Sequence, residues 1–141
     1  MKRVATLAVA AAGAVLSAAS ASAHHSFAAE FDRNLPVTVT GTVTKVEWMN
    51  PHARFYIDAK DDAGKIVNWD FELASPNGLM RRGWTRNSMK VGDVVTVTGS
   101  RAKNAEHVCN ASTVTLANGK KLFAGSSGDE VPTSQGGLAP N

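Results

Sequence analysis

The sequence predicts a small all-β domain that contains one short helix. Between residues 37 and 123, apolar side chains alternate with polar ones, which is the period of a half-buried strand. Turn residues such as Asp61-Asp62-Ala63-Gly64 and Asn118-Gly119 separate the alternating runs. The alternation is interrupted once, around residues 75–83, by a helix-like pattern. We therefore expect five main strands, a short sixth strand, and a helix between the third and fourth.

The first predicted strand covers residues 37–48 and is unusually long. Its apolar positions alternate up to Val43, and the phase then slips by one residue to Val46 and Trp48. Because a one-residue slip moves side chains to the other face of a sheet, the slip beside Gly41 predicts a bulge or a sharp bend.

The second and third strands are expected at residues 53–59 and 65–73. Both place their apolar side chains on one face, as a strand with one face in a core does. On the third strand, Asp70 and Glu72 lie on the opposite face.

The helix has a clear start and a clear end. Ser75 is a good N-cap, and Pro76 follows at the first helical position, where its missing N–H is not needed. Gly83 is placed to end the helix, and Trp84 then packs it against the sheet. The remaining strands are expected at residues 93–100, 109–117 and 121–123.

This order of elements matches a known architecture. Three strands, a short helix and two strands, with a long bent first strand, are typical of the OB-fold, a five-stranded Greek-key barrel. The helix lies where such a barrel needs a plug. The alternative is an immunoglobulin-like sandwich, which has about seven strands and no such helix.

The N-terminus has the three parts of a cleavable export signal. Lys2 and Arg3 are followed by an apolar run at residues 4–16 and by the small residues Ala21-Ser22-Ala23. We expect residues 1–23 to be removed and the mature chain to begin at His24 in the periplasm. No second apolar stretch reaches the roughly 20 residues of a membrane helix, so we expect a soluble protein. A membrane anchor fits less well, because a cleavage site follows the apolar run at once.

The mature chain divides into three parts. We expect an N-terminal arm at residues 24–35, the OB-like barrel at 36–123, and a disordered tail at 124–141. The tail is rich in Gly, Ser and Pro and has no apolar period.

Charge argues against a nucleic-acid partner. The chain has 15 basic and 12 acidic residues, and loss of Lys2 and Arg3 leaves 13 basic residues and a net charge of +1. We interpret the one local basic cluster as a solvated helix face rather than an anion site; it comprises Arg81, Arg82, Arg86 and Lys90.

The single cysteine, Cys109, excludes an intramolecular disulfide. Free cysteines are usually buried, so burial is the default interpretation. Dimer formation, or a soft-metal contact with His107, is the alternative. His107 itself is expected to be exposed and inert in a polar loop.

The predicted mature N-terminus is the most informative feature. An N-terminal histidine chelates a metal through its α-amine and its ring Nδ1, and one further imidazole gives three nitrogens suited to Cu(II). His24 would be the chelating residue, and His25 or His52 the third ligand. If cleavage falls one residue earlier, Ala23-His24-His25 places a histidine third, which also binds Cu(II) or Ni(II). The alternative is that these histidines are only solvated residues of the arm.

The turn at residues 48–52 combines an imidazole with softer groups. Met49 offers a thioether and Trp48 an aromatic face beside His52, and Cu(I) accepts thioether and imidazole ligands. Equally, His52 is a turn residue that hydrogen-bonds the backbone. Asp70 and Glu72 are either surface charges or partners that orient a metal-binding histidine.

No catalytic set is apparent. The sequence has no nucleophile elbow with Ser, His and Asp, and no Gly-rich phosphate loop. We therefore do not expect an enzyme.

Several short motifs occur together, namely His24-His25-Ser26-Phe27, Asn50-Pro51-His52, Asn68-Trp69, Ser75-Pro76-Asn77, Arg82-Gly83-Trp84 and Gly92-Asp93. This combination resembles an uncharacterised family of secreted proteobacterial proteins with a domain of unknown function. The resemblance implies a periplasmic location and a small β-barrel, but no activity. More distantly, the chain is similar to periplasmic copper-binding proteins. One group of those uses an N-terminal histidine, and another holds Cu(I) in a small barrel with His, Met and Trp. Met49 stands alone where the second group has paired methionines.

These observations lead to a functional hypothesis and two alternatives. The hypothesis is a periplasmic metal-binding protein, for copper, that acts in storage, delivery or resistance and has a possible periplasmic protein partner. The first alternative is an OB-fold binding module for a small ligand or an envelope partner, without metal, which uses Trp48, Trp84 and the arginines. The second is an oxidative copper enzyme, for which so small a barrel offers little substrate surface.

Overall fold

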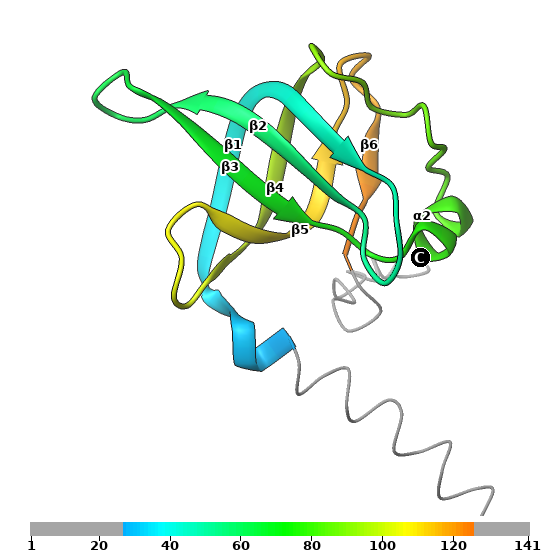
Figure 1. Cartoon of the computed structure of the whole chain (residues 1–141), viewed down its shortest axis with the longest axis horizontal. Helices are drawn as coiled ribbons and strands as arrows, with labels where there is room; N and C mark the ends of the chain where they lie inside the picture. Colours follow the sequence, from blue (N-terminus) through cyan, green and yellow to red (C-terminus); the bar gives the residue numbers. More distant parts are fainter. Residues whose placement is uncertain (1–26, 126–141) are drawn as a thin grey trace, which may run out of the picture.

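A computed structural model describes residues 27–125 of the chain (Figure 1). The structure is mostly β, which confirms the all-β part of the predicted fold class. The predicted signal peptide, His24, His25 and residues 126–141 of the predicted tail lie outside the described residues. After a short helical segment at 27–30, the elements are β1 (Phe31–Glu47), β2 (Arg54–Lys60), β3 (Ile66–Glu72), α2 (Pro76–Arg81), β4 (Val94–Ala102), β5 (Val108–Thr115) and β6 (Lys121–Phe123).

The strand pairings form a circuit that returns to its start. β1 pairs antiparallel with both β2 and β4, β2 pairs antiparallel with β3, and β4 pairs antiparallel with β5. A short parallel pairing joins β3 to β5, from Asp70↔Val108 to Glu72↔Asn110. Within the circuit, each of these five strands therefore has two neighbours, and β5 also pairs with β6.

β1 bends because its first part pairs with β4 and its last part pairs with β2. Thr42 pairs with a residue of β2 and with a residue of β4. The register with β2 shifts between Val43 and Lys45, which confirms the bulge or bend predicted from the slip in phase. Gly41 permits the close crossing, since a Cβ there would lie 2.5 Å from the carbonyl oxygen of Asp58. Figure 1 shows β1 curving over the top of the molecule.

β1 begins earlier than the alternation indicates. Phe31 is buried and pairs with Ala102, whereas the predicted strand begins at residue 37 and the predicted arm covers residues 24–35. Between Phe31 and Pro36 the register is irregular, and residues 32–34 are polar. An irregular polar stretch breaks the two-residue period, so the alternation alone does not reveal this part of the strand.

α2 has the predicted caps. The hydroxyl of Ser75 accepts a hydrogen bond of 3.2 Å from the N–H of Gly78. Gly83 has a φ of 90°, and the N–H of Trp84 donates back to the carbonyl of Leu79 at 3.1 Å. This 6→1 hydrogen bond with a left-handed glycine is the Schellman pattern that ends helices.

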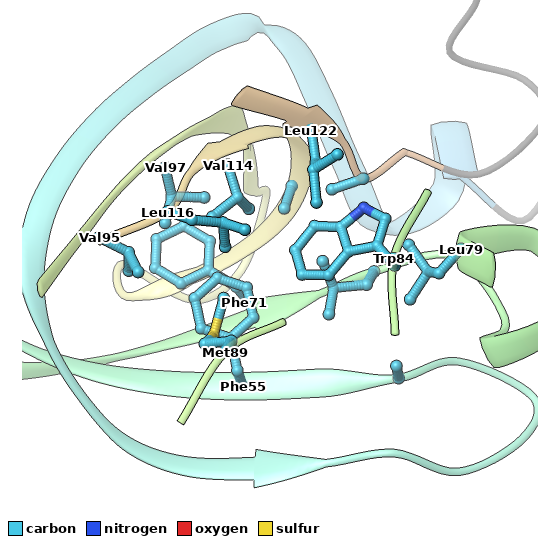
Figure 2. Close-up of a cluster of buried hydrophobic side chains, with 14 of the residues drawn as sticks. Phe55, Phe71, Leu79, Trp84, Met89, Val95, Val97, Val114, Leu116 and Leu122 are labelled. Atoms are coloured by element: carbon cyan, nitrogen blue, oxygen red, sulfur yellow. The ribbon is translucent and has the colours of Figure 1, made fainter. Parts of the chain in front are cut away.

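Side chains from strands on opposite sides of the circuit meet in one core (Figure 2). The rings of Phe55 and Phe71 stack with their centroids 5.2 Å apart. Trp84 is 3% exposed, and its indole N–H donates to the carbonyl of Phe123 at 2.8 Å. Trp84 thus joins the segment after α2 to β6, in agreement with the packing role expected from the sequence.

The folded part of the chain continues past β6. Ala124, the first residue of the predicted tail, is fully buried. Its N–H donates to the carbonyl of Ser112, and its own carbonyl accepts from the N–H of Ala74. The guanidinium of Arg82 donates to the carbonyl of Gly125. Ala124 thus connects Ser112 of β5 with Ala74, which follows β3. The folded domain therefore includes residues 124 and 125.

Candidate functional site

The loop with His52 is tied to the segment between β3 and α2. His52 Nδ1 lies 3.1 Å from the carbonyl oxygen of Leu73. Backbone hydrogen bonds from Ala53 to Ala74 and from Leu73 to Ala53 hold the loop in the same place. His52 is therefore a turn residue that hydrogen-bonds the backbone, as one of the two interpretations expected. Because Nδ1 must carry the proton to donate to a carbonyl, the lone pair lies on Nε2.

The other residues of this loop flank an apolar hollow. Met49 is 57% exposed, and the half-buried Trp48 packs against the core. The hollow lies between the loop and the segment after α2; its lining residues are Val46, Trp48, Phe55, Leu73, Trp84, Thr85, Arg86 and Met89. Three residues expected to bind a ligand in a metal-free module line this hollow, namely Trp48, Trp84 and Arg86. Of these, Trp84 is buried in the core.

Asp70 and Glu72 bind Arg54 on the outer face of β2 and β3. Arg54 Nε and Nη2 donate to the two carboxylate oxygens of Asp70, each at 3.0 Å. Its Nη1 donates to Glu72 Oε2 at 3.1 Å. Burial lowers the pKa of Arg54, but the hydrogen bonds and charges of the two carboxylates outweigh it and leave that pKa raised. These carboxylates therefore neutralise an arginine in the structure, and no hydrogen bond joins them to a histidine among the described residues.

Asn110 extends this polar cluster onto β5. Its side chain is 2% exposed, and Nδ2 donates to Glu72 Oε1 at 3.3 Å. Its Oδ1 has no hydrogen-bond partner within the part of the chain that the structure describes. Asn110 thus joins the side chains of β2, β3 and β5 in a single cluster.

His107 differs from the exposed loop residue expected from the sequence. Its backbone carbonyl accepts a hydrogen bond of 2.9 Å from the N–H of Asp70. Its ring is half-buried and meets Trp69 in a T-shaped contact, with centroids 4.9 Å apart and planes at 88°. The parallel pairing of β3 with β5 draws His107 onto β3, and a sequence pattern does not reveal that pairing.

The chain just before β1 is fixed beside the loop between β4 and β5. The N–H of Lys103 donates to the carbonyl of Glu30 at 2.9 Å, and its ammonium group donates to the carbonyl of Ala28. Phe31 pairs with Ala102 at the end of β4. Residues 27–31 therefore lie against the β4–β5 loop, as Figure 1 shows at the lower left.

Cys109 is enclosed in the core. It is fully buried, and this burial raises the pKa of its thiol to about 12. A buried neutral thiol is a poor nucleophile and a poor metal ligand. The burial expected from the sequence is therefore confirmed.

Cys109 is accordingly expected to resist thiol reagents while the domain is folded. At pH 8 a disulfide reagent should modify far less than one thiol per molecule over an hour, because only the thiolate reacts and the sulfur is inaccessible. As the control, the same protein unfolded in urea should react with one equivalent of the reagent per molecule. Rapid stoichiometric modification of the folded protein would contradict the burial.

The described part of the chain holds no complete metal site. Across residues 27–125, no three side chains of His, Cys, Asp or Glu come close enough together to hold a metal ion. The same residues include no helix long and apolar enough to cross a membrane.

Comparison with known proteins agrees with the resemblance to a family with a domain of unknown function. The model of a family of unknown function, DUF6152, matches residues 12–111, from within the apolar N-terminal run to the middle of β5. No curated protein and no solved structure matches significantly. Because the match covers most of the chain, this protein belongs to the DUF6152 family.

Proposed function

We propose that this protein is a periplasmic copper-binding protein that acts in copper storage, delivery or resistance. Cleavage of residues 1–23 exposes His24, whose α-amine and ring Nδ1 chelate the ion. A further imidazole supplies the third nitrogen, an arrangement that suits the tetragonal preference of Cu(II).

The anchoring of residues 27–31 is the observation that supports this proposal best. Lys103 and Ala102 fix this segment to the folded domain. His24 precedes Phe27 by three residues, which span at most about 11 Å when fully extended. A chelating N-terminus tethered so closely loses less conformational freedom on binding than one at the end of a long free arm.

His25 and His52 are the imidazoles that the sequence offers as third ligand. The hydrogen bond from Nδ1 to the Leu73 carbonyl orients the ring of His52 and leaves Nε2 as the binding nitrogen, which is how metal-binding histidines are commonly held. The exposed thioether of Met49 adds a soft ligand for Cu(I) beside it.

The closed circuit of pairings supports an OB-like barrel as the scaffold. β1, β2, β3, β5 and β4 follow one another around the circuit in the order of that architecture, with α2 between β3 and β4. Such a barrel would supply a rigid support for a site built at its surface.

Titration of the correctly processed protein tests the proposal. Mass spectrometry first establishes that His24 is the first residue, and Cu(II) binding is then followed through its d–d absorbance. His24→Ala is expected to weaken binding by at least about 100-fold, because it removes the ring nitrogen of the chelate. Ser26→Ala, a change in the same segment that removes no nitrogen ligand, is the matched control. Wild-type protein that binds Cu(II) no tighter than micromolar would refute the function.

The hollow beside Trp48 favours a second candidate, a metal-free binding module. It combines an apolar floor with Thr85 and the positive charge of Arg86. Such a site would take a small apolar group with a negative end. A Trp48→Ala change would then weaken ligand binding, while the wild-type protein would stay empty in excess Cu(II).

A further inference from the structure

We propose that the first half of β1 is a dimerisation surface, to which a second copy of this chain adds its own β1 as an antiparallel strand. The surface is the side of residues 36–41 that faces away from β4, and we call it the open edge. None of these residues belongs to the proposed copper site, so the inference goes beyond the proposed function and does not depend on it.

One side of this half-strand has no partner strand. β4 pairs with β1 in an unbroken register from Pro36 to Thr42, whereas β2 pairs with β1 only from Thr42 to Glu47. No third strand pairs with β1 within residues 27–125. In Figure 1 this half of β1 rises along the left side of the molecule before the strand curves over the top. Such an unpaired edge presents backbone donors and acceptors to which a further strand can add.

The backbone groups of Thr38 and Thr40 are the ones that face the open edge. The N–H of Val43 donates to the carbonyl of Asp93, and the carbonyl of Val43 accepts from the N–H of Gly92, each at 2.8 Å. The backbone groups of Val43 therefore face the β4 side. Because these groups point to alternate sides along a strand, those of Thr38 and Thr40 face away from β4. The two threonines thus offer two N–H and two C=O groups to a partner strand.

The side chains of the open edge favour strand addition. Natural proteins often protect an edge strand with charged side chains or proline. Residues 37–44 read VTVTGTVT, without a charge or a proline, and Thr38 and Thr40 are exposed. Pro36 limits the edge on one side, and the pairing with β2 at Thr42 limits it on the other. A partner strand therefore has access to Thr38 and Thr40 between these limits.

A second copy fits because the open edge is complementary to itself. Two copies related by a two-fold axis at Val39 place Thr38 of each copy beside Thr40 of the other. Each of these two residue pairs exchanges two hydrogen bonds. The resulting four hydrogen bonds satisfy every N–H and C=O group that the two threonines turn away from β4.

The charges of β1 also permit two copies to pair. Each end of the strand carries one acidic and one basic side chain, Asp32 with Arg33 at the start and Lys45 with Glu47 at the end. Lys45 and Glu47 already form an ion pair within the chain. Antiparallel pairing brings opposite ends of the two strands together, and each end is neutral. Two copies therefore meet without net repulsion, whereas a charged peptide would gain nothing from the uncharged stretch between the ends.

The dimer is expected to be weak. Its pairing joins the β1–β4–β5 sheets of both copies into one continuous sheet, but only through four hydrogen bonds. A contact of so few residues falls below the roughly 1,200–2,000 Å² that stable complexes bury. We therefore expect a dimer Kd between about 1 µM and 1 mM.

Sedimentation of the processed, metal-free protein tests the proposal. The wild type should pass from monomer to dimer as its concentration rises from about 1 µM to 1 mM. Thr40→Pro removes an N–H that the pairing with β4 does not use, and with it two of the four intermolecular hydrogen bonds. It should weaken dimerisation by at least about tenfold. Thr40→Ala, the matched control, keeps that N–H and should dimerise as the wild type does, while circular dichroism verifies that both variants fold.

Two further substitutions test the edge and its register. Thr38→Lys keeps every backbone group but places a charge on the open edge, so it should be monomeric even if Thr40→Pro does not fold. Across the two-fold axis the α-carbons of Val39 would lie about 4.5 Å apart, within the range of a disulfide. Val39→Cys should therefore crosslink two copies under mild oxidation. Thr40→Cys should not, because its α-carbons would lie about 7–8 Å apart, and the native Cys109 is buried.

The outcomes are decisive for this surface alone. A wild-type protein that stays monomeric throughout this concentration range would refute the pairing of two copies, and an extended segment of another protein would become the candidate occupant of the edge. A dimer that survives both Thr40→Pro and Thr38→Lys, and that Val39→Cys fails to crosslink, would use a different surface. Neither result bears on the Cu(II) titration, because these measurements are made without metal.

Discussion

Replacement of Phe71 by alanine is expected to lower the free energy of unfolding by about 3–5 kcal/mol. Phe71 is fully buried on β3, where that strand pairs with both β2 and β5. Its ring stacks on Phe55 and also packs against Trp69, at 6.0 Å between centroids. The alanine leaves a cavity and removes the contacts to Phe55 and Trp69. The cavity also lies beside the pairing of β3 with β5, which is the shortest pairing of the circuit. For a domain whose total stability is about 5–15 kcal/mol, this is a large fraction.

Urea unfolding followed by far-UV circular dichroism measures this loss. Ile66→Ala is the matched control, since Ile66 lies on the same strand but is 54% exposed. Its effect should be within about 1 kcal/mol, because little apolar area leaves the core. Equal losses for the two variants would show that the Phe71 ring does not hold the strands together.

Gly99→Ala is expected to destabilise the domain by about 3 kcal/mol, the upper end of the range for overpacking. A Cβ at Gly99 would lie 2.2 Å from the carbonyl oxygen of Asn110, a distance that no side-chain rotation relieves. β4 and β5 would have to separate at the irregularity between Thr98 and Gly99. The cause is steric, since Gly99 is not among the glycines with positive φ.

Gly64→Ala provides the contrasting control. Gly64 has a φ of 80°, but a Cβ there meets no atom within 4 Å. Its cost is only the left-handed backbone conformation, about 1–2 kcal/mol. The midpoint of urea unfolding should therefore fall further for Gly99→Ala than for Gly64→Ala. The reverse order would mean that the backbone of β5 can shift away from Gly99 at little cost in stability.

Local features of this fold could be predicted because short-range chemistry determines them. Ser75, Pro76 and Gly83 define the helix through hydrogen bonds that span a few residues. The bend in β1 follows from a phase slip that is visible in the side-chain pattern. Alternation also predicts which face of each strand enters the core.

The roles of the charged and ligand-type side chains were harder to predict. Asp70 and Glu72 were candidates to orient a histidine, and in the structure they neutralise Arg54 on the neighbouring strand. That partner depends on the register of β2 with β3, because a shift of one residue would move Arg54 to the opposite face.

The sequence by itself determined the all-β class, the helix caps, the bent first strand and the burial of Cys109. Only the tertiary structure decided that β3 pairs with β5, that residues 27–31 lie on the β4–β5 loop, and that His107 contacts Trp69. The physical reason is the range of the interactions. Caps and alternation act over a few residues, whereas a parallel pairing between residues 38 positions apart leaves no periodic trace in either strand.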